Sequence, residues 1–179
     1  MLEIEALTAE ERAGLDSIVD RWFDTKNGTG RPGALLSILE EAQERERWQY
    51  LSEATLRYIA ERTGTPTSRL YSIVTFYSFF NLHPQGEHSI VVCRGTACHT
   101  RGSRALLAEA ASRLGAEGFN VDSDTTFTTA DRRFTVRTVA CFGQCALAPV
   151  VAIDGVIYSR ITTAKLASLI ARVAKGGSK

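Results

Sequence analysis

Four cysteines in two close pairs are the residues of this chain best suited to chemistry. The first pair is Cys93 and Cys98, with four residues between them, and the second is Cys141 and Cys145, with three. The sequence holds no other cysteine. Two thiolate pairs separated by a long stretch are typical of a metal centre with four sulfur ligands. Iron–sulfur clusters are centres of this kind, and they carry electrons.

The same spacing also bears on other kinds of cysteine site. Structural zinc also takes four thiolates, although its cysteine pairs are usually closer together. A thioredoxin-type redox pair has two intervening residues, which neither pair here has. A Rieske centre needs two histidine ligands, and none of His83, His88 and His99 lies near the second pair. The spacing favours an iron–sulfur centre, but zinc and four unrelated buried cysteines remain open.

The elements that would position the thiols are two predicted strands. The apolar run from Ser89 to Val92 predicts a buried strand that ends at Cys93, and a loop over residues 94–102 would carry Cys98. The alternating segment from Phe134 to Val139 predicts a second strand ahead of Cys141. Glycines in both loops permit tight turns and close approach of backbone amides to sulfur. We therefore expect these loop residues to surround the cofactor: Gly95, Thr96, Ala97, Gly143 and Gln144.

The rest of the second half predicts a small mixed sheet flanked by helices. A helix with Leu107, Ala110, Ala111 and Leu114 on its core face should join the two strands, which favours a parallel pair. Asp154-Gly155 is a strong two-residue hairpin signal between two short apolar runs, residues 150–153 and 156–158. Apolar residues at helical spacing, from Leu166 to Val173, predict a closing helix.

The sequence pattern of the first half predicts a series of helices. Thr8 and Glu11 form a capping-box pattern ahead of the first helix, and Pro32 suits the first turn of a second. A third helix is predicted over 52–62, closed by Gly64, and Thr65-Pro66 would open a fourth that runs to about Val74. After Gly86 the sequence pattern changes from helical to a mixture of strands and helices. The chain is therefore predicted to be α+β, with a helical region over residues 1–86 and a sheet domain over 87–179.

Composition excludes several classes of function. With 179 residues and a formal net charge of +1, the chain shows no sign of binding nucleic acid, and no apolar run reaches the ~18 residues of a membrane span. The first residues lack a secretory pattern, so we expect a cytoplasmic protein. No phosphate-binding glycine motif and no nucleophile–base arrangement is present. We therefore expect no activity from the chain alone.

Two motifs around the cysteines resemble a known family. The segments 92–99, Val-Cys-Arg-Gly-Thr-Ala-Cys-His, and 141–150, Cys-Phe-Gly-Gln-Cys-Ala-Leu-Ala-Pro-Val, are similar to the thioredoxin-like 2Fe–2S subunit of NADH dehydrogenase (complex I). The same subunit type occurs in NAD-linked and electron-bifurcating hydrogenases and in NAD-dependent formate dehydrogenases. The segments 32–36 and 74–80 also resemble the family, so the likeness covers roughly residues 30 to 172.

The resemblance implies a cofactor and partners. It implies one 2Fe–2S cluster held by Cys93, Cys98, Cys141 and Cys145, in a thioredoxin-like second half. It also implies that the helical first half packs on a partner subunit, an iron–sulfur flavoprotein that binds FMN and NAD(H). Further iron–sulfur or catalytic subunits would complete the assembly. The cluster would exchange single electrons with the partner's FMN. The alternatives are a structural zinc module for assembly and a stand-alone thioredoxin-like ferredoxin.

Two features stand apart from this interpretation. In the segment 126–132, Phe127 and Arg132 replace a glutamate and a turn glycine of the family's usual pattern, so the geometry of that turn is open. The aromatic run that includes Phe76, Tyr77 and Phe79 would either form a docking surface or pack the helical region onto the sheet domain.

Overall fold

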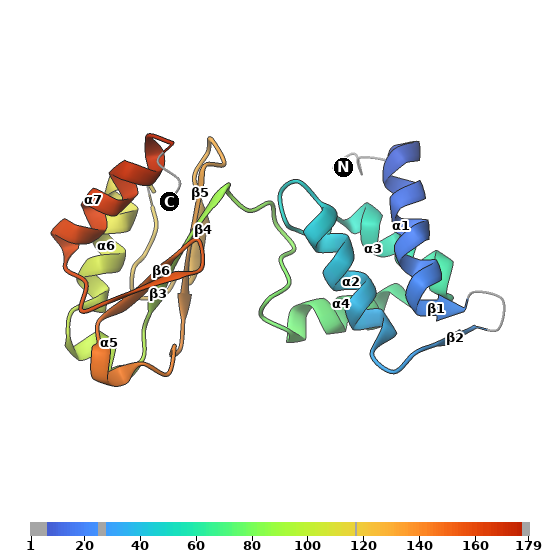
Figure 1. Cartoon of the computed structure of the whole chain (residues 1–179), viewed down its shortest axis with the longest axis horizontal. Helices are drawn as coiled ribbons and strands as arrows, with labels where there is room; N and C mark the ends of the chain where they lie inside the picture. The colour runs from blue at the N-terminus through green and yellow to red at the C-terminus, as the bar shows by residue number, and fades with distance from the viewer. Residues whose placement is uncertain (1–6, 25–27, 117, 177–179) are drawn as a thin grey trace. The chain divides into compact units, whose positions relative to one another are not determined.

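The computed structural model describes residues 7–24, 28–116 and 118–176. The chain divides into two compact units, Met1–Pro84 and Gln85–Lys179. The first unit is built from helices and the second from a sheet with helices (Figure 1). This architecture confirms the predicted α+β class, with a helical part followed by a small mixed sheet. No helix in the described ranges combines the length and the apolar character that a bilayer crossing requires.

The first unit contains four helices and one short strand pair in its described part. They are α1 (Ala9–Trp22), β1 (Phe23–Asp24), β2 (Thr29–Gly30), α2 (Ala34–Arg45), α3 (Glu53–Thr63) and α4 (Thr67–Phe76). The predicted capping box is present, because the Thr8 hydroxyl accepts from the Glu11 N–H at 3.3 Å and the Glu11 carboxylate accepts from the Thr8 N–H at 2.7 Å. Gly64 ends α3 in the left-handed region, as predicted, with φ of 63°.

Two helix starts differ from the prediction. Pro32 lies outside α2, whose N-cap is Gly33 with φ of 79°, so the first turn begins two residues after the proline. Pro66 is the N-cap of α4 rather than its first residue, because its ψ of 135° is extended. No side chain caps α4, so Thr65 does not serve as the predicted cap, and the helix continues to Phe76.

The core of the first unit is formed where the helices meet. Its fully buried side chains include Val19, Ile38, Leu39, Ile59 and Leu70.

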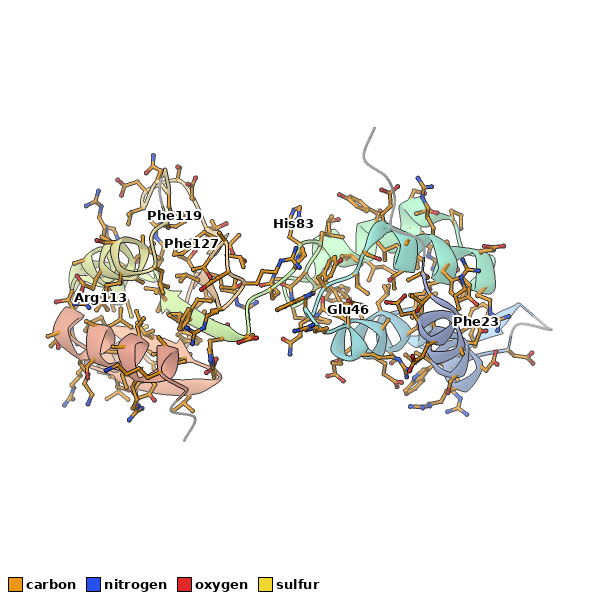
Figure 2. The ribbon with its side chains drawn as sticks, turned by 90° about the horizontal axis from the view of Figure 1, so that it is seen from above. Phe23, Glu46, His83, Arg113, Phe119 and Phe127 are labelled. Carbon is orange, nitrogen blue, oxygen red and sulfur yellow. The ribbon has the colours of Figure 1, made fainter. Side chains whose placement is uncertain are left out.

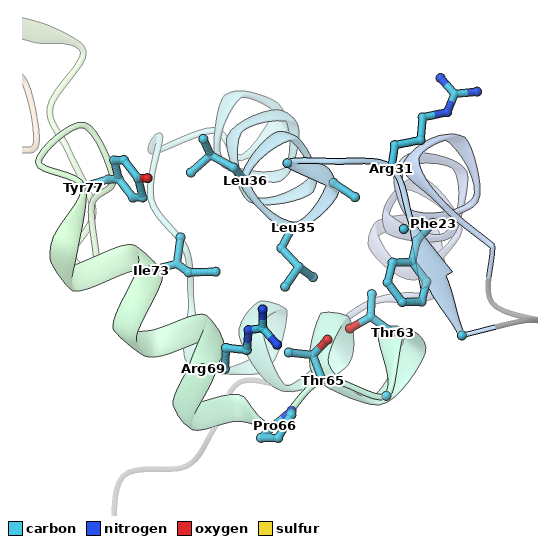
Figure 3. Close-up of a pocket in the computed structure, with 15 residues that line it drawn as sticks. Phe23, Arg31, Leu35, Leu36, Thr63, Thr65, Pro66, Arg69, Ile73 and Tyr77 are labelled. Carbon is cyan, nitrogen blue, oxygen red and sulfur yellow. The ribbon is translucent and has the colours of Figure 1, made fainter.

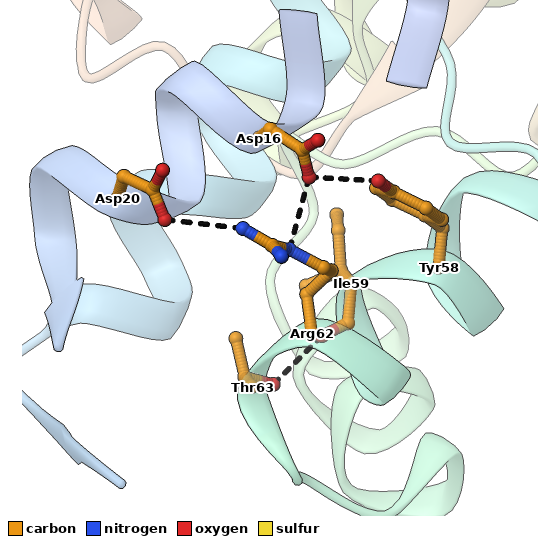
Figure 4. Close-up of polar contacts among 6 residues, drawn as sticks. All are labelled: Asp16, Asp20, Tyr58, Ile59, Arg62 and Thr63. Atoms are coloured by element: carbon orange, nitrogen blue, oxygen red, sulfur yellow. Dashed lines mark hydrogen bonds and ion pairs between the residues drawn. The ribbon is translucent and has the colours of Figure 1, made fainter. Parts of the chain in front are cut away.

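A polar network links α1 to α3 at the edge of that core (Figure 4). Asp16 accepts a hydrogen bond from the Tyr58 hydroxyl at 2.7 Å and pairs with the Arg62 guanidinium at 2.9 Å. The same guanidinium reaches Asp20 at 3.1 Å. The hydrogen bond to Asp16 raises the pKa of Tyr58, because the carboxylate stabilises the protonated phenol. One arginine thus ties two turns of α1 to the end of α3.

The second unit contains a five-stranded mixed sheet in the order β4-β5-β3-β6-β7. The strands are β3 (His88–Cys93), β4 (Thr126–Thr128), β5 (Phe134–Val139), β6 (Val150–Ile153) and β7 (Val156–Ser159). The helices are α5 (Thr96–Thr100), α6 (Ser103–Arg113), the 3₁₀ turn η1 (Cys145–Leu147) and α7 (Thr163–Ala174). β3 and β5 are parallel, and all other pairs are antiparallel. The predicted parallel pair and the hairpin at Asp154-Gly155 are confirmed.

α6 and α7 pack on one face of this sheet (Figure 1). Alternate residues of the central strands point to the helices, as the two-residue period of a strand requires. That layer includes Ile90, Val92, Val136, Val151 and Ile153, and it meets Leu106, Leu107, Ala110, Leu166, Leu169 and Ile170. The core between this face of the sheet and the two helices holds β3 and β5 in place. It therefore also determines where the cysteine loops leave the sheet.

The segment that departs from the family pattern forms an edge strand and a tight turn. β4 was not predicted, but it pairs with β5 and turns Phe127 toward Phe119, with ring centroids 4.7 Å apart (Figure 2). Arg132 adopts a φ of 54°, so it occupies the left-handed conformation that a turn glycine would supply. Asp131 accepts from the Arg133 N–H at 3.0 Å inside the turn. The turn thus keeps a glycine-like geometry without glycine.

Candidate metal centre

The parallel pairing of β3 and β5 brings the two cysteine loops to the same edge of the sheet. Cys93 at the end of β3 lies opposite Val139 at the end of β5, and the Arg94 N–H donates to the Val139 carbonyl at 2.8 Å. Cys141 follows only two residues later. Because the carboxyl ends of parallel strands meet at one edge, thiols far apart in sequence become neighbours.

All four cysteines are free thiols, and their side chains are linked by pairwise contacts. The thiols of Cys98 and Cys141 both donate hydrogen bonds to the Cys93 sulfur. The sulfurs of Cys141 and Cys145 lie 3.7 Å apart. In the described part of the chain, no group of three or more His, Cys, Asp or Glu side chains is close enough together to hold a single metal ion. The thiols form a chain of contacts that joins both pairs.

The two pairs differ in exposure. Cys93 and Cys98 are buried, each with 2% of its surface exposed, whereas Cys141 and Cys145 are exposed. Ala148 and Val150 form a small apolar cluster with the buried pair, and Ala97 and Phe142 pack against it. The first pair therefore lies inside the fold and the second faces outward.

Backbone amides point at the sulfurs. Gly95 and Phe142 donate to the Cys93 sulfur, and Val150 donates to that of Cys98. The Gly143 N–H lies 3.2 Å from the Cys141 sulfur and donates to it. Amides in these positions stabilise negative charge on sulfur, whether on a thiolate or on a metal-bound thiolate.

These contacts shift the thiol pKa values in opposite directions. Burial alone raises the pKa of Cys93, but the hydrogen bonds from Gly95 and Phe142, with those from the neighbouring thiols, outweigh it and leave that pKa below its usual value. Burial raises the pKa of Cys98, and its hydrogen bond to Cys93 raises it further. The pKa of Cys145 is raised because its thiol donates to Cys141. Among Cys93, Cys98 and Cys145, Cys93 is therefore the residue whose surroundings most favour the negatively charged thiolate.

The two loop glycines serve different geometric needs. At Gly95 the backbone is ordinary, but a Cβ there would lie 2.8 Å from the Ala140 carbonyl oxygen and 3.5 Å from the Cys141 sulfur. Only a residue without a side chain lets the two loops approach so closely. Gly143 instead has a φ of 78° with open space around it, so its requirement is conformational.

The other predicted loop residues are placed as follows. Cys98 lies on the short helix α5 instead of the predicted loop, and Thr96 begins that helix, where its carbonyl accepts from the Thr100 hydroxyl at 3.0 Å. Ala97 packs on the buried thiols. Gln144 is half-buried and uses its carbonyl to accept from Leu147, and within the described residues its side chain has no bond to a thiol.

Sequence reasoning missed the backbone donors Phe142 and Val150. Phe142 directly follows Cys141, so its position inside the second motif was a signal, whereas the role of Val150 depends on the fold of β6 beside β3. The donor set fits a 2Fe–2S cluster: four thiols offer two ligands for each iron, and the amides supply the hydrogen bonds that such sulfurs accept.

Comparison with known families and proteins gives consistent matches. Residues 19–174 match the family model described as "Thioredoxin-like [2Fe-2S] ferredoxin". The NADP-reducing hydrogenase subunit HndA of Solidesulfovibrio fructosivorans is 30% identical over 141 residues, which cover 79% of this chain and 77% of that protein. A subunit of the NADH-quinone oxidoreductase of Rickettsia typhi is 35% identical over 141 residues, which cover 79% of this chain and 78% of that protein.

A solved structure supports the fold. A chain of an NAD⁺-reducing [NiFe]-hydrogenase in the air-oxidized state is similar over 80% of this chain, with a TM-score of 0.64 and 23% identity. The likeness covers only 23% of that hydrogenase chain. At this level of identity the match shows the fold alone.

Proposed function

This chain belongs to the thioredoxin-like [2Fe-2S] ferredoxin family, and we propose that it is the one-electron carrier subunit of a larger NAD(P)-linked oxidoreductase. The observation that carries the proposal is the meeting of both cysteine pairs at the carboxyl edge of β3 and β5. Membership of the family shows the type of cofactor, and the grouping of the four thiols supports these cysteines as its ligands.

The ligands in this proposal are Cys93 and Cys98 for one iron and Cys141 and Cys145 for the other. The cluster supplies reversible uptake of one electron. The chain's own groups decide how readily that happens: the amides of Gly95, Phe142 and Gly143 stabilise charge on the sulfurs, and the apolar cluster around the first pair limits water. No general acid or base is required for this task.

The partner in this proposal is a flavoprotein that binds FMN and NAD(H) and carries its own iron–sulfur cluster. Relatives named as subunits of an NADH-quinone oxidoreductase and of an NADP-reducing hydrogenase support a place in a multi-subunit assembly that uses a nicotinamide. A nicotinamide gives up two electrons as hydride, while the cluster accepts one, so a flavin is the suitable intermediary. We place the assembly in the cytoplasm, where reducing conditions preserve free thiols.

The test of the cofactor is electron paramagnetic resonance of the anaerobically purified, dithionite-reduced chain, with iron and acid-labile sulfide counted on the same sample. We expect a spin-half signal, two irons and two sulfides per chain. Zinc in place of iron, after anaerobic reconstitution as well as before it, would contradict the proposal and favour a structural zinc module.

The test of the partner is reduction by NADH. The isolated chain should stay oxidised with NADH, and the complex with its flavoprotein should show the cluster signal after NADH is added. A full signal from the isolated chain with NADH would contradict the assignment of the flavin to a partner. Full native activity of the flavoprotein without this chain would favour a stand-alone ferredoxin.

A further inference from the structure

A groove on the helical unit lies outside the cysteine site and has the chemistry of a docking surface. Its volume is about 550 Å³. Leu35 and Leu36 of α2 lie across it from Arg69 and Ile73 of α4, with Phe23 at one end (Figure 3). The groove therefore combines an apolar lining with a guanidinium.

The positive charge in this groove is not balanced by any residue in the described part of the chain. Arg69 and Arg31 line it, and neither side chain has an ion pair or hydrogen bond with any described residue. No aspartate or glutamate is among its described lining residues. Arginines elsewhere in the unit do pair, as Arg62 does with Asp16 and Asp20. An unpaired guanidinium beside apolar side chains suits a carboxylate that arrives with an apolar neighbour.

The apolar surface continues beyond the groove along α4. Arg69, Ile73 and Phe76 are spaced i, i+4 and i+7, so they share one face of the helix. Phe76 is 80% exposed, and its ring meets that of Tyr77 at 5.0 Å in an edge-to-face arrangement. Tyr77 lines the groove and in turn contacts Phe79 at 5.8 Å.

The row of aromatic rings is anchored in the core at the Phe79 end. Phe79 packs on Phe80 with centroids 4.2 Å apart, and Phe80 is buried in the core of the unit. A contiguous set of exposed aromatic rings anchored in this way is typical of a protein interface. A small anion would occupy the groove alone and leave Phe76 and Phe79 uncovered.

We propose that this groove and the adjoining rings of Phe76, Tyr77 and Phe79 bind an acidic, amphipathic segment of a partner subunit. An aliphatic or aromatic side chain of that segment would fill the groove between Leu35 and Ile73, and a carboxylate within one helical turn of it would pair with Arg69. A second copy of this chain is a poor occupant, because a symmetric contact would bring the unpaired arginines together. The inference rests on the proposed function only in expecting a partner subunit.

The experiment is photocrosslinking in cells that make the full chain, with p-benzoylphenylalanine in place of Phe76. A matched control carries the same replacement at Ile157, an exposed apolar residue of the sheet unit. Mass spectrometry then identifies the crosslinked peptide. We expect one segment of one other protein, with an aspartate or glutamate within four residues of the crosslinked apolar residue, and no such product from the Ile157 control.

A charge-reversal variant distinguishes specific docking from non-specific hydrophobic association. Arg69→Glu should lower the crosslink yield about tenfold, while Arg172→Glu, an exposed arginine on α7, should leave it unchanged. Changing the partner's carboxylate to lysine should restore the yield in Arg69→Glu. The paramagnetic signal of the cluster should be equal in parent and variants, which shows that the chain remains folded.

Other outcomes overturn the inference: no crosslink, crosslinks to this chain itself or to lipid, a segment without a carboxylate, or a yield that Arg69→Glu does not change. The identity of the crosslinked protein tests the partner assignment separately. A segment with the expected chemistry in a protein without flavin would support the groove and contradict the flavoprotein proposal. An absent cluster signal would contradict the proposed function and leave the crosslinking result intact.

Discussion

The two cysteine pairs have the same chemistry and opposite settings. Cys93 and Cys98 lie inside the fold, against Ala148 and Val150, while Cys141 and Cys145 are exposed. The first pair is fixed by a central strand and a helix, and the second by a loop and a 3₁₀ turn. The difference shows that one half of the proposed centre lies in the core and the other half at the surface, so substitutions in the two halves should have unequal effects.

The largest expected contrast is between Cys93→Ser and Cys145→Ser. Cys93→Ser should reduce bound iron to less than about a tenth of the parental amount, because a buried hydroxyl cannot replace the thiolate or reach water. Cys145→Ser should retain about half, because its exposed loop can readjust and a hydroxyl there is solvated. Iron and sulfide counts after anaerobic reconstitution measure both. Equal loss in the two variants would show that exposure does not separate the pairs.

The loop glycines give a smaller contrast on the same principle. Gly95→Ala should lower the free energy of unfolding by about 2–3 kcal/mol, because its Cβ would meet the Ala140 carbonyl oxygen at 2.8 Å. Gly143→Ala should cost about 1 kcal/mol, since it meets no atom and bears only the strain of a positive φ. Denaturant unfolding of the two variants tests the order. A greater loss for Gly143→Ala would place the tighter constraint in the second loop.

The reduction potential should respond to charge beside the buried pair. The Arg101 guanidinium lies 3.4 Å from the carbonyl oxygen of Ala148, which packs on Cys93 and Cys98. Arg101→Gln should lower the midpoint potential by about 20–40 mV, because a positive charge favours the more negative reduced cluster. Arg94→Ala should shift it in the same direction. Arg172→Gln is the control, and a redox titration showing no change or a rise in the Arg101 variant would contradict this argument.

The smallest expected effect lies in the turn between β4 and β5. Arg132→Gly should raise the free energy of unfolding by about 0.5–1 kcal/mol, because glycine adopts the φ of 54° without strain. Arg133→Gly is the matched control and should lower stability, since the Arg133 side chain donates to the Ala174 carbonyl. Thermal unfolding measures both variants. The iron content should stay unchanged, which would show that this turn and the cysteine loops are independent.

The parts of the fold predicted from sequence were those with strong local signals. β5 and the Asp154-Gly155 hairpin followed from alternation and turn chemistry, and the capping box at Thr8 marked the start of α1. α5 was missed because a five-residue helix has no room for a hydrophobic period, and its N-cap, Gly95, has no side chain that could signal the start of a helix. β4 was missed because three residues carry little pattern, and its existence depends on pairing with β5.

The resemblance to the family was confirmed by the family model and by relatives along most of the chain. The grouping of the thiols was foreseeable because both predicted strands end just before a cysteine. The unequal burial of the two pairs was not foreseeable, since it depends on the packing of Ala148 and Val150 around Cys93 and Cys98. The groove proposed as a docking surface was also not foreseeable, because it joins residues of α2 and α4 that no sequence period connects.

The parallel register of β3 and β5 has a consequence for how the chain is maintained. A cluster held by Cys93 and Cys141 together crosslinks two loops that are far apart in sequence, much as a disulfide would. Closing a loop of this size restricts the unfolded chain enough to contribute on the order of 4 kcal/mol to stability. The supply of iron and sulfide would then govern the amount of folded subunit as well as its ability to carry electrons.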